Sequence, residues 1–139
     1  MDIDIRLLGP GDDNYLARVA PEVFDHSIDS DLLTQFLNDP RHHVAVAIDR
    51  ETVVGFASAV HYIHPDKPVE LWINEVGVAP THQGQGIGKK LLLALFDRAR
   101  ALGCTEAWVL TDRSNVAAMR LYAAVGGDAT DNVMFTFDL

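Results

Sequence analysis

The feature that most constrains this fold is an amphipathic helix pattern that begins directly after a glycine-rich turn. Within Gly86–Leu102 the apolar residues recur at helical spacing, and Gly103 is suited to end the helix. Strand patterns flank this helix at Leu71–Val78 and Glu106–Thr111. Two strands of one sheet that are joined through a helix run parallel, with a right-handed crossover. The sequence therefore predicts a parallel strand–helix–strand unit.

The remaining patterns add shorter elements around this unit. Further strands are expected at Asp4–Leu8, His43–Ile48, Thr52–Tyr62 and Val133–Asp138, and further helices from Asp12 or Asp13 to about Val19, after Ser30 and Asp31 to Leu37, and over Val116–Val125. Short turns between the early strands favour antiparallel pairing. We expect one α/β (α+β) domain over residues 1–139, a mixed sheet with helices on its faces.

Composition excludes several classes of function. The chain has 139 residues, 48% of them hydrophobic, which suits a globular domain and not a disordered one. A net charge of −9 argues against nucleic acid or an anionic membrane as the main partner and suits a cationic substrate. The single cysteine, Cys104, excludes an intrachain disulfide, and we expect no metal site. The acidic start at Met1–Leu8 lacks a signal-peptide pattern, so a cytoplasmic location is expected.

The glycine-rich turn itself predicts an anion site. Glycines allow a tight turn whose amide N–H groups face a ligand at a helix N-terminus, where the helix dipole favours negative charge. A P-loop reading fails because Gln83 and Lys90 stand where a glycine and a Ser or Thr are needed. A dinucleotide fingerprint fails because Gly84, Gly86 and Gly88 have the wrong spacing. The pattern Q/R-x-x-G-x-G/A fits residues 83–88.

With this motif the chain resembles the GNAT family of N-acetyltransferases. A second signature of that family, N-x-x-A-x-x-L-Y followed by a glycine, is matched by Asn115–Gly126. The stretches Glu70–Val78 and Val133–Leu139 are similar to the aminoglycoside 3-N-acetyltransferase I branch. The resemblance covers nearly all of the chain and implies the GNAT fold, in which the parallel strands 4 and 5 of the mixed sheet diverge.

The resemblance implies acetyl-CoA as the cofactor and direct transfer of its acetyl group to a primary amine. The amides of Gln85, Gly86 and Gly88 are the candidates for the pyrophosphate, and strand residues for the pantetheine arm. The full expected cofactor-binding set is Val76, Gly77, Val78, Gln83, Gly84, Gln85, Gly86, Ile87, Gly88, Lys89, Asn115 and Tyr122. Three of these residues have structural alternatives: Gly77 as a bulge, Asn115 as a helix cap alone, and Lys89 as a solvated surface residue.

Two residues are expected to be catalytic. Tyr122 matches the family position for a general acid that protonates the departing thiolate, and the alternative is a core aromatic residue. Glu75, a carboxylate in an otherwise apolar strand, is the candidate general base, directly or through water. Strict alternation places Glu75 with Leu71 and Ile73, so a bulge near Val76 is expected to direct it to the cleft. The alternative is a carboxylate on the solvent face of an edge.

The sequence says least about which amine accepts the acetyl group. Glu70, His61 and Asp138 are candidates for binding a cationic substrate. An aminoglycoside or similar polycation leads, with antibiotic resistance as the implied role, because the surplus of acid suits it. A protein amine, an amino-acid-like amine or a non-catalytic acyl-CoA-binding module are the alternatives. A homodimer is suggested by the family alone.

Overall fold

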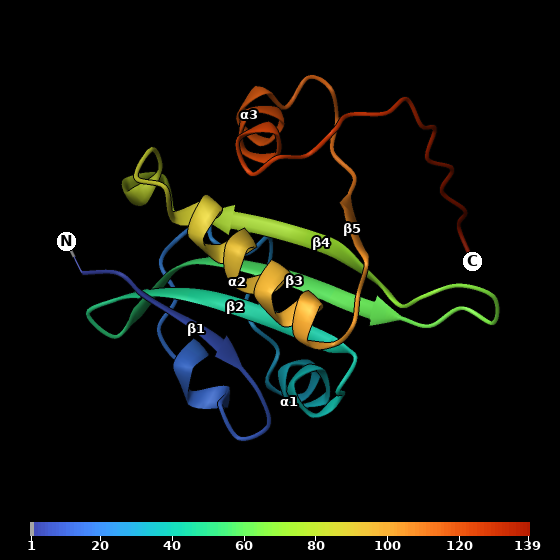
Figure 1. Cartoon of the computed structure of the whole chain (residues 1–139). Coiled ribbons are helices and arrows are strands. Elements are labelled where there is room, and N and C mark those ends of the chain that lie inside the picture. Colours follow the sequence, from blue (N-terminus) through green and yellow to red (C-terminus); the bar gives the residue numbers. More distant parts are fainter. Residues whose placement is uncertain (1) are drawn as a thin grey trace.

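The computed structural model describes residues 2–139 and shows a mixed five-stranded sheet (Figure 1). Its strands are β1 (Asp4–Leu8), β2 (His42–Asp49), β3 (Thr52–Tyr62), β4 (Glu70–Val78) and β5 (Glu106–Val109), in that spatial order. Neighbours from β1 to β4 pair antiparallel, and β4 pairs with β5 in parallel. The expected mixed sheet and its parallel unit are confirmed.

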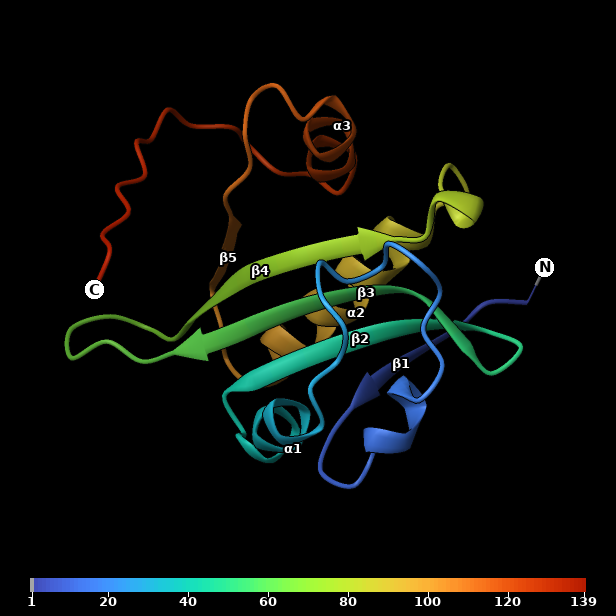
Figure 2. The same ribbon diagram turned by 180° about the vertical axis from the view of Figure 1, so that it is seen from behind.

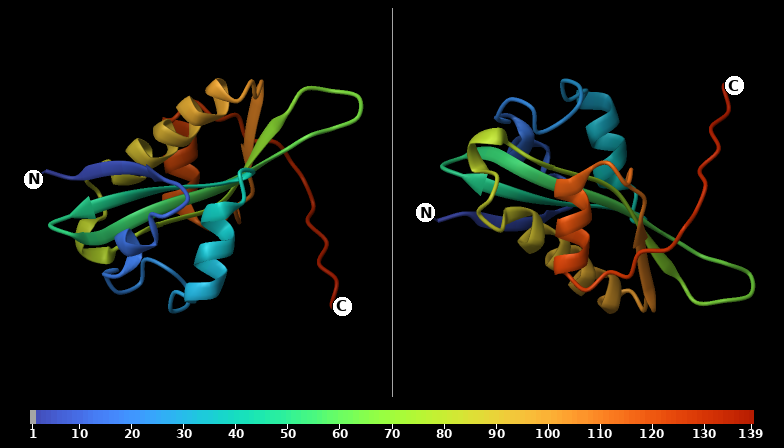
Figure 3. Two further views of the ribbon diagram at one scale, coloured as in Figure 1. Left: turned by 90° about the horizontal axis from the view of Figure 1, so that it is seen from below. Right: turned by 90° about the horizontal axis from the view of Figure 1, so that it is seen from above.

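Helices cover both faces of this sheet. They are α1 (Ser30–Asn38), α2 (Ile87–Ala101) and α3 (Val116–Ala124), with short 3₁₀ turns η1 (Asp13–Leu16) and η2 (Pro80–His82). Figure 3 shows α1 and α2 on opposite sides of the strands, as expected. Within residues 2–139, no helix combines the length and apolar character needed to cross a bilayer.

The first expected helix is wrong beyond its first turn. It ends at Leu16 as η1, because the chain that follows pairs with the sheet instead. The amide of Ala20 donates to the Val53 carbonyl, and the Val53 amide donates to the Arg18 carbonyl. Backbone pairing with β3 replaces the helical hydrogen bonds that these residues would otherwise make.

Packing of α2 against the sheet forms the centre of the core. Leu91, Leu92 and Leu95 of α2 are fully buried, and burial of each such side chain stabilises the fold by about 1.5–3 kcal/mol. A close approach at Gly55 of β3 makes this possible, because a Cβ there would lie 3.2 Å from Ile87 and 3.3 Å from Leu91. The amphipathic pattern of the sequence therefore corresponds to a real buried stripe.

The parallel strands β4 and β5 diverge after a short common stretch. Pairing joins only Glu70–Ile73 of β4 to Glu106–Val109 of β5. Among residues 2–139, no strand pairs with β4 on that side from residue 74 to Val78, and the two strands separate towards α3 (Figure 1). This is the divergence that the sequence resemblance implied.

The expected last strand at Val133–Asp138 is wrong for the single chain. Residues 128–139, the C-terminal arm, are extended but form no strand. A strand is defined by its hydrogen-bonded neighbour. Over the described residues, the backbone of the arm has no hydrogen bond to another segment. The alternating apolar pattern is present, but the partner ladder is missing.

Two histidines form a hydrogen-bonded pair between β2 and β3. His43 Nε2 lies 2.7 Å from His61 Nδ1, and the two rings stack with centroids 5.0 Å apart. Burial, with a smaller contribution from His61, lowers the pKa of His43 to about 4. Burial also lowers the pKa of His61. The bond needs one donor and one acceptor, so at least one of the two rings must be neutral.

We expect this pair to make the fold sensitive to mild acid. A lowered pKa means that the unfolded chain binds more protons, so the contribution to stability is complete above about pH 6.5 and is lost as the pH falls towards about 4. Each histidine contributes a slope of at most about 1.4 kcal/mol per pH unit. Urea unfolding between pH 4 and 7 should therefore show a shallower pH dependence in His43→Leu. The exposed His26→Leu is the control, and an unchanged slope in His43→Leu would contradict the assignment.

Candidate active site

The glycine-rich turn between β4 and α2 adopts the conformation that its sequence requires. Gly84 has φ 77° and Gly86 has φ 79°, both in the left-handed region that favours glycine. A Cβ at either position would meet no atom within 4 Å. The turn is therefore held by backbone geometry and stays open to a ligand.

Side chains fix this turn to the end of β4. Gln83 Nε2 donates to the Val78 carbonyl at 3.0 Å. His82 Nε2 lies 2.8 Å from Asp49 Oδ2, which ties η2 to the end of β2. Ile87, at the start of α2, is buried in the core. The amides of the turn are thus held in place before any ligand arrives.

The N-terminus of α2 offers free amide donors. Gly86 is its N-cap and supplies no side-chain hydrogen bond. The first backbone bond within the helix runs from Lys90 to the Gly86 carbonyl, so the preceding amides have no helical acceptor. Together with the dipole of a 15-residue helix, they suit an anion such as a diphosphate. Gly88 also lets α2 and α3 approach each other closely, because a Cβ there would lie 3.1 Å from Leu121 of α3.

α3 packs against the start of α2, where Gly88 lies close to Leu121. Asn115 Oδ1 accepts a hydrogen bond from the Ala118 amide at 3.1 Å, so Asn115 caps α3. Tyr122 is half-buried, and burial raises the pKa of its phenol. A raised pKa keeps the phenol protonated at neutral pH, which a proton donor requires. Val76, Gly77 and Val78 are also half-buried and have no strand on the β5 side.

A bulge in β4 sets the direction of Glu75. Ala59 pairs with Ile73, but its neighbour Ser58 pairs with Glu75, so Asn74 is an extra residue in β4. An extra residue reverses the alternation of side chains. Ile73 therefore points into the core, while Glu75 lines a pocket on the other face. The expected bulge is present, with Asn74 as its extra residue, two positions before Val76.

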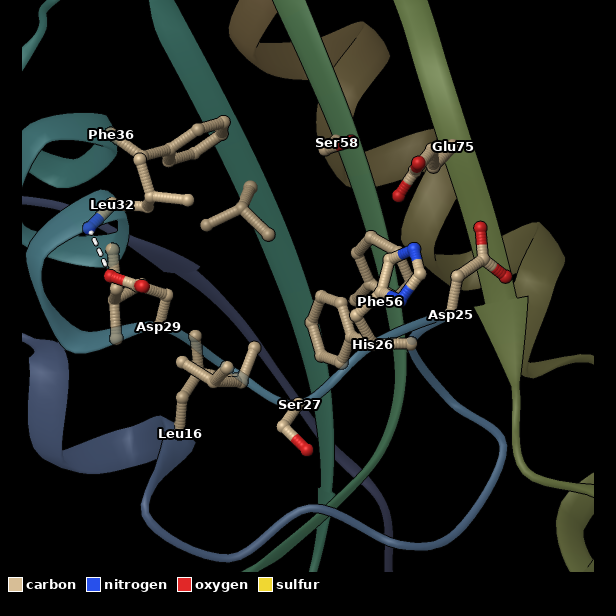
Figure 4. Close-up of a pocket in the computed structure, with 14 residues that line it drawn as sticks. Leu16, Asp25, His26, Ser27, Asp29, Leu32, Phe36, Phe56, Ser58 and Glu75 are labelled. Carbon is tan, nitrogen blue, oxygen red and sulfur yellow. Dashed lines mark hydrogen bonds between the residues drawn. The ribbon is translucent and has the colours of Figure 1, made fainter.

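The pocket beside Glu75 has a volume of about 420 Å³. Its walls come from η1, the loop before α1, α1 itself and strands β2 to β4 (Figure 4). The lining residues are Leu16, Phe24, Asp25, His26, Ser27, Ile28, Asp29, Leu32, Leu33, Phe36, Val44, Phe56, Ser58 and Glu75. Phe24 and Phe56 stack with centroids 3.9 Å apart. Most of the pocket wall is apolar, with a few polar groups, as is common for sites that bind small molecules.

The charges in this pocket have one sign. Asp25, Asp29 and Glu75 line it, and none of the described lining residues is Lys or Arg. In Figure 4 Asp25 and His26 lie on the Glu75 side, and Leu32 and Phe36 lie on the α1 side. Asp29 also accepts from the amides of Asp31 and Leu32 as the N-cap of α1. Carboxylates without a lysine or arginine favour a cationic ligand.

Sequence reasoning missed the loop that supplies Asp25, His26 and Asp29. This segment has no periodicity, and only the polar run Asp25–Ser27 between apolar residues hinted at a site. Its position depends on a contact with β4 that no local pattern encodes. A Cβ at Gly77 would lie 2.4 Å from the Val23 carbonyl, so the glycine allows the loop to cross the strand (Figure 2). Gly77 is not at the bulge, and its closest contact is this loop.

Three expected substrate residues lie away from the pocket. His61 pairs with His43. Glu70 accepts from the Tyr62 hydroxyl at 3.3 Å and lies 3.0 Å from His64 Nε2, near the loop that joins β3 to β4. Asp138 is exposed in the C-terminal arm. The structure therefore does not gather them around Glu75, and Tyr122 also lies outside the lining of this pocket.

Divergent parallel strands, a glycine-rich turn before a helix and an acid-lined pocket together suit a ligand with an anionic group near the turn and a cationic ligand in the pocket. A family model described as "Acetyltransferase (GNAT) family" matches residues 13–126. The chain belongs to this family, and the resemblance seen in its motifs is confirmed. The family uses acetyl-CoA, the cofactor expected from the sequence.

Relatives in the family differ in what they acetylate. The chain is 39% identical over 90 residues to the N-alpha-acetyltransferase RimI of Mycobacterium tuberculosis. The matched stretch covers 65% of this chain and 54% of that protein. It is 34% identical over 86 residues to a mycothiol acetyltransferase of Saccharopolyspora erythraea, covering 60% and 26%. The matches thus span about half or less of these relatives.

Among solved structures, an aminoglycoside acetyltransferase from an uncultured soil metagenomic sample, in complex with trehalose, is similar along almost its whole length. The TM-score is 0.84 at 25% identity, with 99% of this chain and 95% of that chain covered. The shared fold includes both the glycine-rich turn before α2 and the elements that line the pocket.

We expect the left-handed turn to control coenzyme affinity. Gly86→Val places a β-branched residue at φ 79°, which forces the turn and its amides out of position. The stabilisation that acetyl-CoA gives in thermal unfolding should fall, with Kd rising by about tenfold or more.

Gly11→Val is the matched control for this experiment. Gly11 has φ 88° and likewise no atom within 4 Å of a built Cβ, but it lies far along the chain from the turn. It should lower the melting temperature and leave the Kd for acetyl-CoA unchanged. Equal coenzyme affinity in both variants would remove the turn from the binding site.

Proposed function

We propose that this protein is an N-acetyltransferase that transfers an acetyl group from acetyl-CoA to a cationic primary amine. One observation carries the proposal: the unpaired end of β4 joins an anion-binding turn to a carboxylate-lined pocket. Glu75 in that pocket and the open stretch Val76–Val78 are consecutive in the chain. An amine in the pocket and a thioester beside β4 would therefore lie next to each other.

The coenzyme half of the site uses backbone groups. The amides of Gln85, Gly86 and Gly88 would hold the diphosphate, with Lys89 as an exposed cation nearby. The free edge of Val76–Val78 would pair with the amide groups of the pantetheine arm, as another strand would. A free amide N–H of that edge, near Val78, would polarise the thioester carbonyl. Acetyl-CoA supplies the activated acetyl group.

Two side chains handle the protons. Glu75, directly or through one water, would take a proton from the bound ammonium so that the amine lone pair can attack the carbonyl carbon. The carbon–sulfur bond breaks, and Tyr122 would give its proton to the sulfur. Glu75 lines the pocket and Tyr122 does not, so the base and the acid would approach the thioester from different directions.

A polycationic small molecule is our leading acceptor. Asp25, Asp29 and Glu75 present three carboxylates to one cavity, and the molecule carries a net charge of −9. Several carboxylates can hold several ammonium groups of one ligand and guide it to the site. The aminoglycoside acetyltransferase of the same fold supports this choice. Acetylation of an aminoglycoside would remove one of its positive charges and so give antibiotic resistance.

A second candidate acceptor is the N-terminal amine of a peptide. The apolar walls, among them Leu32, Leu33 and Phe36, suit a side chain next to the amine better than a sugar ring. The similarity to an N-alpha-acetyltransferase favours the same candidate. Both candidates place one ammonium group beside Glu75.

A thiol-release assay over a panel of acceptors tests the proposal. Aminoglycosides, polyamines and short peptides with free N-termini are compared at equal concentration with acetyl-CoA. We expect turnover with aminoglycosides or polyamines and little with N-blocked peptides. Turnover confined to peptides would select the second candidate. No turnover with any amine, together with intact acetyl-CoA binding, would indicate a non-catalytic acyl-CoA-binding module.

We expect the two proton-handling residues to give different signatures. Glu75→Gln should lower kcat by about 10²-fold or more and remove the rising limb of the pH–rate profile. Tyr122→Phe should lower kcat while leaving the Kd for acetyl-CoA within about twofold, because only the hydroxyl is removed. Stopped assays across pH 5–9 and equilibrium binding provide both readouts.

Glu51→Gln and Tyr15→Phe are the controls for these variants. Neither residue lines the pocket, both are at the surface, and the ion pair of Glu51 with Arg18 is exposed and therefore weak. They should leave kcat and the pH profile unchanged. If Glu75→Gln keeps the wild-type profile, another base or bulk water accepts the proton.

A further inference from the structure

The two tryptophans of the chain stack on each other where β4 pairs with β5. Trp72 of β4 is the register partner of Trp108 of β5, and their rings lie 5.0 Å apart between centroids, at 9° to each other. We call these two stacked rings the tryptophan platform. Trp72 is 37% exposed, although a large aromatic side chain gains most by burial. A stacked indole that stays at the surface suits contact with a ligand.

Hydrogen bonds hold the platform in one position. Trp108 Nε1 donates to the Tyr62 hydroxyl at 2.7 Å, and this hydroxyl donates to Glu70 Oε1 at 3.3 Å. The Tyr62 ring also meets the Trp108 ring edge on, with centroids 6.4 Å apart. The Glu70 side chain is mostly buried, with 16% of it exposed. Because the rings are already fixed, a ligand would lose little free energy in ordering them.

The platform lies on the same face of the sheet as the pocket beside Glu75. Glu75 pairs with Ser58 of β3. Trp72 pairs with Val60, which is two residues further along β3. Alternate residues of a strand share a face, as do paired residues of neighbouring strands, and two residues span about 7 Å. In Figure 4 Ser58 and Glu75 lie at the upper edge of the lining, and neither tryptophan belongs to that lining. The platform therefore continues the floor of the pocket beyond Glu75.

We propose that the tryptophan platform binds a ring of a multi-ring amino sugar whose reacting ammonium group lies beside Glu75, an inference that rests on the proposed function. A sugar ring presents a face of C–H bonds that packs on an indole, and ammonium groups on the ring are attracted to the same π face. The distance of about 7 Å along the strand is comparable to the spacing of neighbouring rings in an oligosaccharide. One ring would then occupy the pocket while the next covers Trp72.

Charge brings polycations to this site, and the platform selects among them. The pocket carboxylates of Asp25, Asp29 and Glu75 attract any ligand with several ammonium groups. A linear polyamine can touch an indole with one ammonium group, but it has no ring face to cover it. An amino sugar has both the charges and the face. Because specificity is a difference between affinities, we expect a preference for cyclic over linear polycations.

Tryptophan fluorescence tests the contact directly, because both tryptophans of the chain belong to the platform. Kanamycin, a multi-ring amino sugar, and spermidine, a linear polyamine, are titrated into the protein with and without coenzyme A. Isothermal titration calorimetry measures their binding in parallel. We expect kanamycin to change the tryptophan emission in step with its binding heat, and spermidine to bind with little change in emission. Kanamycin binding without a change in emission, no kanamycin binding, or an equal change with spermidine would overturn the proposal.

Trp72→Leu and Trp72→Phe form a matched pair of variants. Leucine keeps an apolar side chain at this partly exposed position and removes the aromatic ring, whereas phenylalanine keeps a ring. The Kd of kanamycin should rise by about tenfold in Trp72→Leu and stay within about threefold in Trp72→Phe, and spermidine should change by less than about threefold in both. Circular dichroism should show both variants folded. An unchanged Kd for kanamycin in Trp72→Leu would contradict the assignment, as would a loss confined to a short peptide with a free N-terminus.

The same variants separate the platform from the proposed function. If Trp72→Leu loses affinity for kanamycin and the wild type acetylates no amine, the acetyl transfer is wrong and the platform is a binding site. If the wild type acetylates amines and Trp72→Leu keeps its affinity for kanamycin, the transfer stands and the platform is wrong. Where both hold, Trp72→Leu should raise the KM for kanamycin by about tenfold and leave kcat within about twofold, because Trp72 lies away from the reacting groups.

Discussion

The candidate site depends on the fact that β4 and β5 pair over only part of their length. β4 and β5 share only four residue pairs, from Glu70 to Ile73 on β4, and then separate. A buried strand edge without a partner is costly, because its amide and carbonyl groups have lost water. The protein keeps Val76–Val78 only half-buried, so these groups remain reachable. The opening that results is where a ligand with amide groups of its own can complete the sheet.

Much of this arrangement was predictable from local patterns. The helix α2, its preceding turn and the parallel strands follow from apolar periodicity and from glycines whose φ is positive, as at Gly84 and Gly86. The bulge was predicted from a conflict: Glu75 shares the alternation of Ile73, which must be buried. In each case the chemistry of nearby residues in the sequence was sufficient.

What local patterns failed to predict depends on contacts between distant segments. The loop with Asp25 and His26 is positioned where the Val23 carbonyl meets Gly77, more than fifty residues later. His61 was a candidate substrate residue, but it pairs with His43 on the neighbouring strand and does not line the pocket. The apolar pattern at 133–138 predicted a strand that the structure does not have, because a pattern in one segment cannot show whether a neighbouring strand is available.

The close contact between Gly77 and Val23 connects β4, which leads to a turn with a restricted sequence, to a loop whose sequence can vary. The turn at Gly84 and Gly86 can hardly change, because both residues have a positive φ that favours glycine. The segment from Asp25 to Asp29 follows the close contact between the Val23 carbonyl and Gly77 of β4, and is itself largely at the surface. Substitutions there can alter the shape and charge of the pocket without moving the turn. Under the proposed function, a single glycine would let one scaffold acquire new acceptors while conserving its acyl donor.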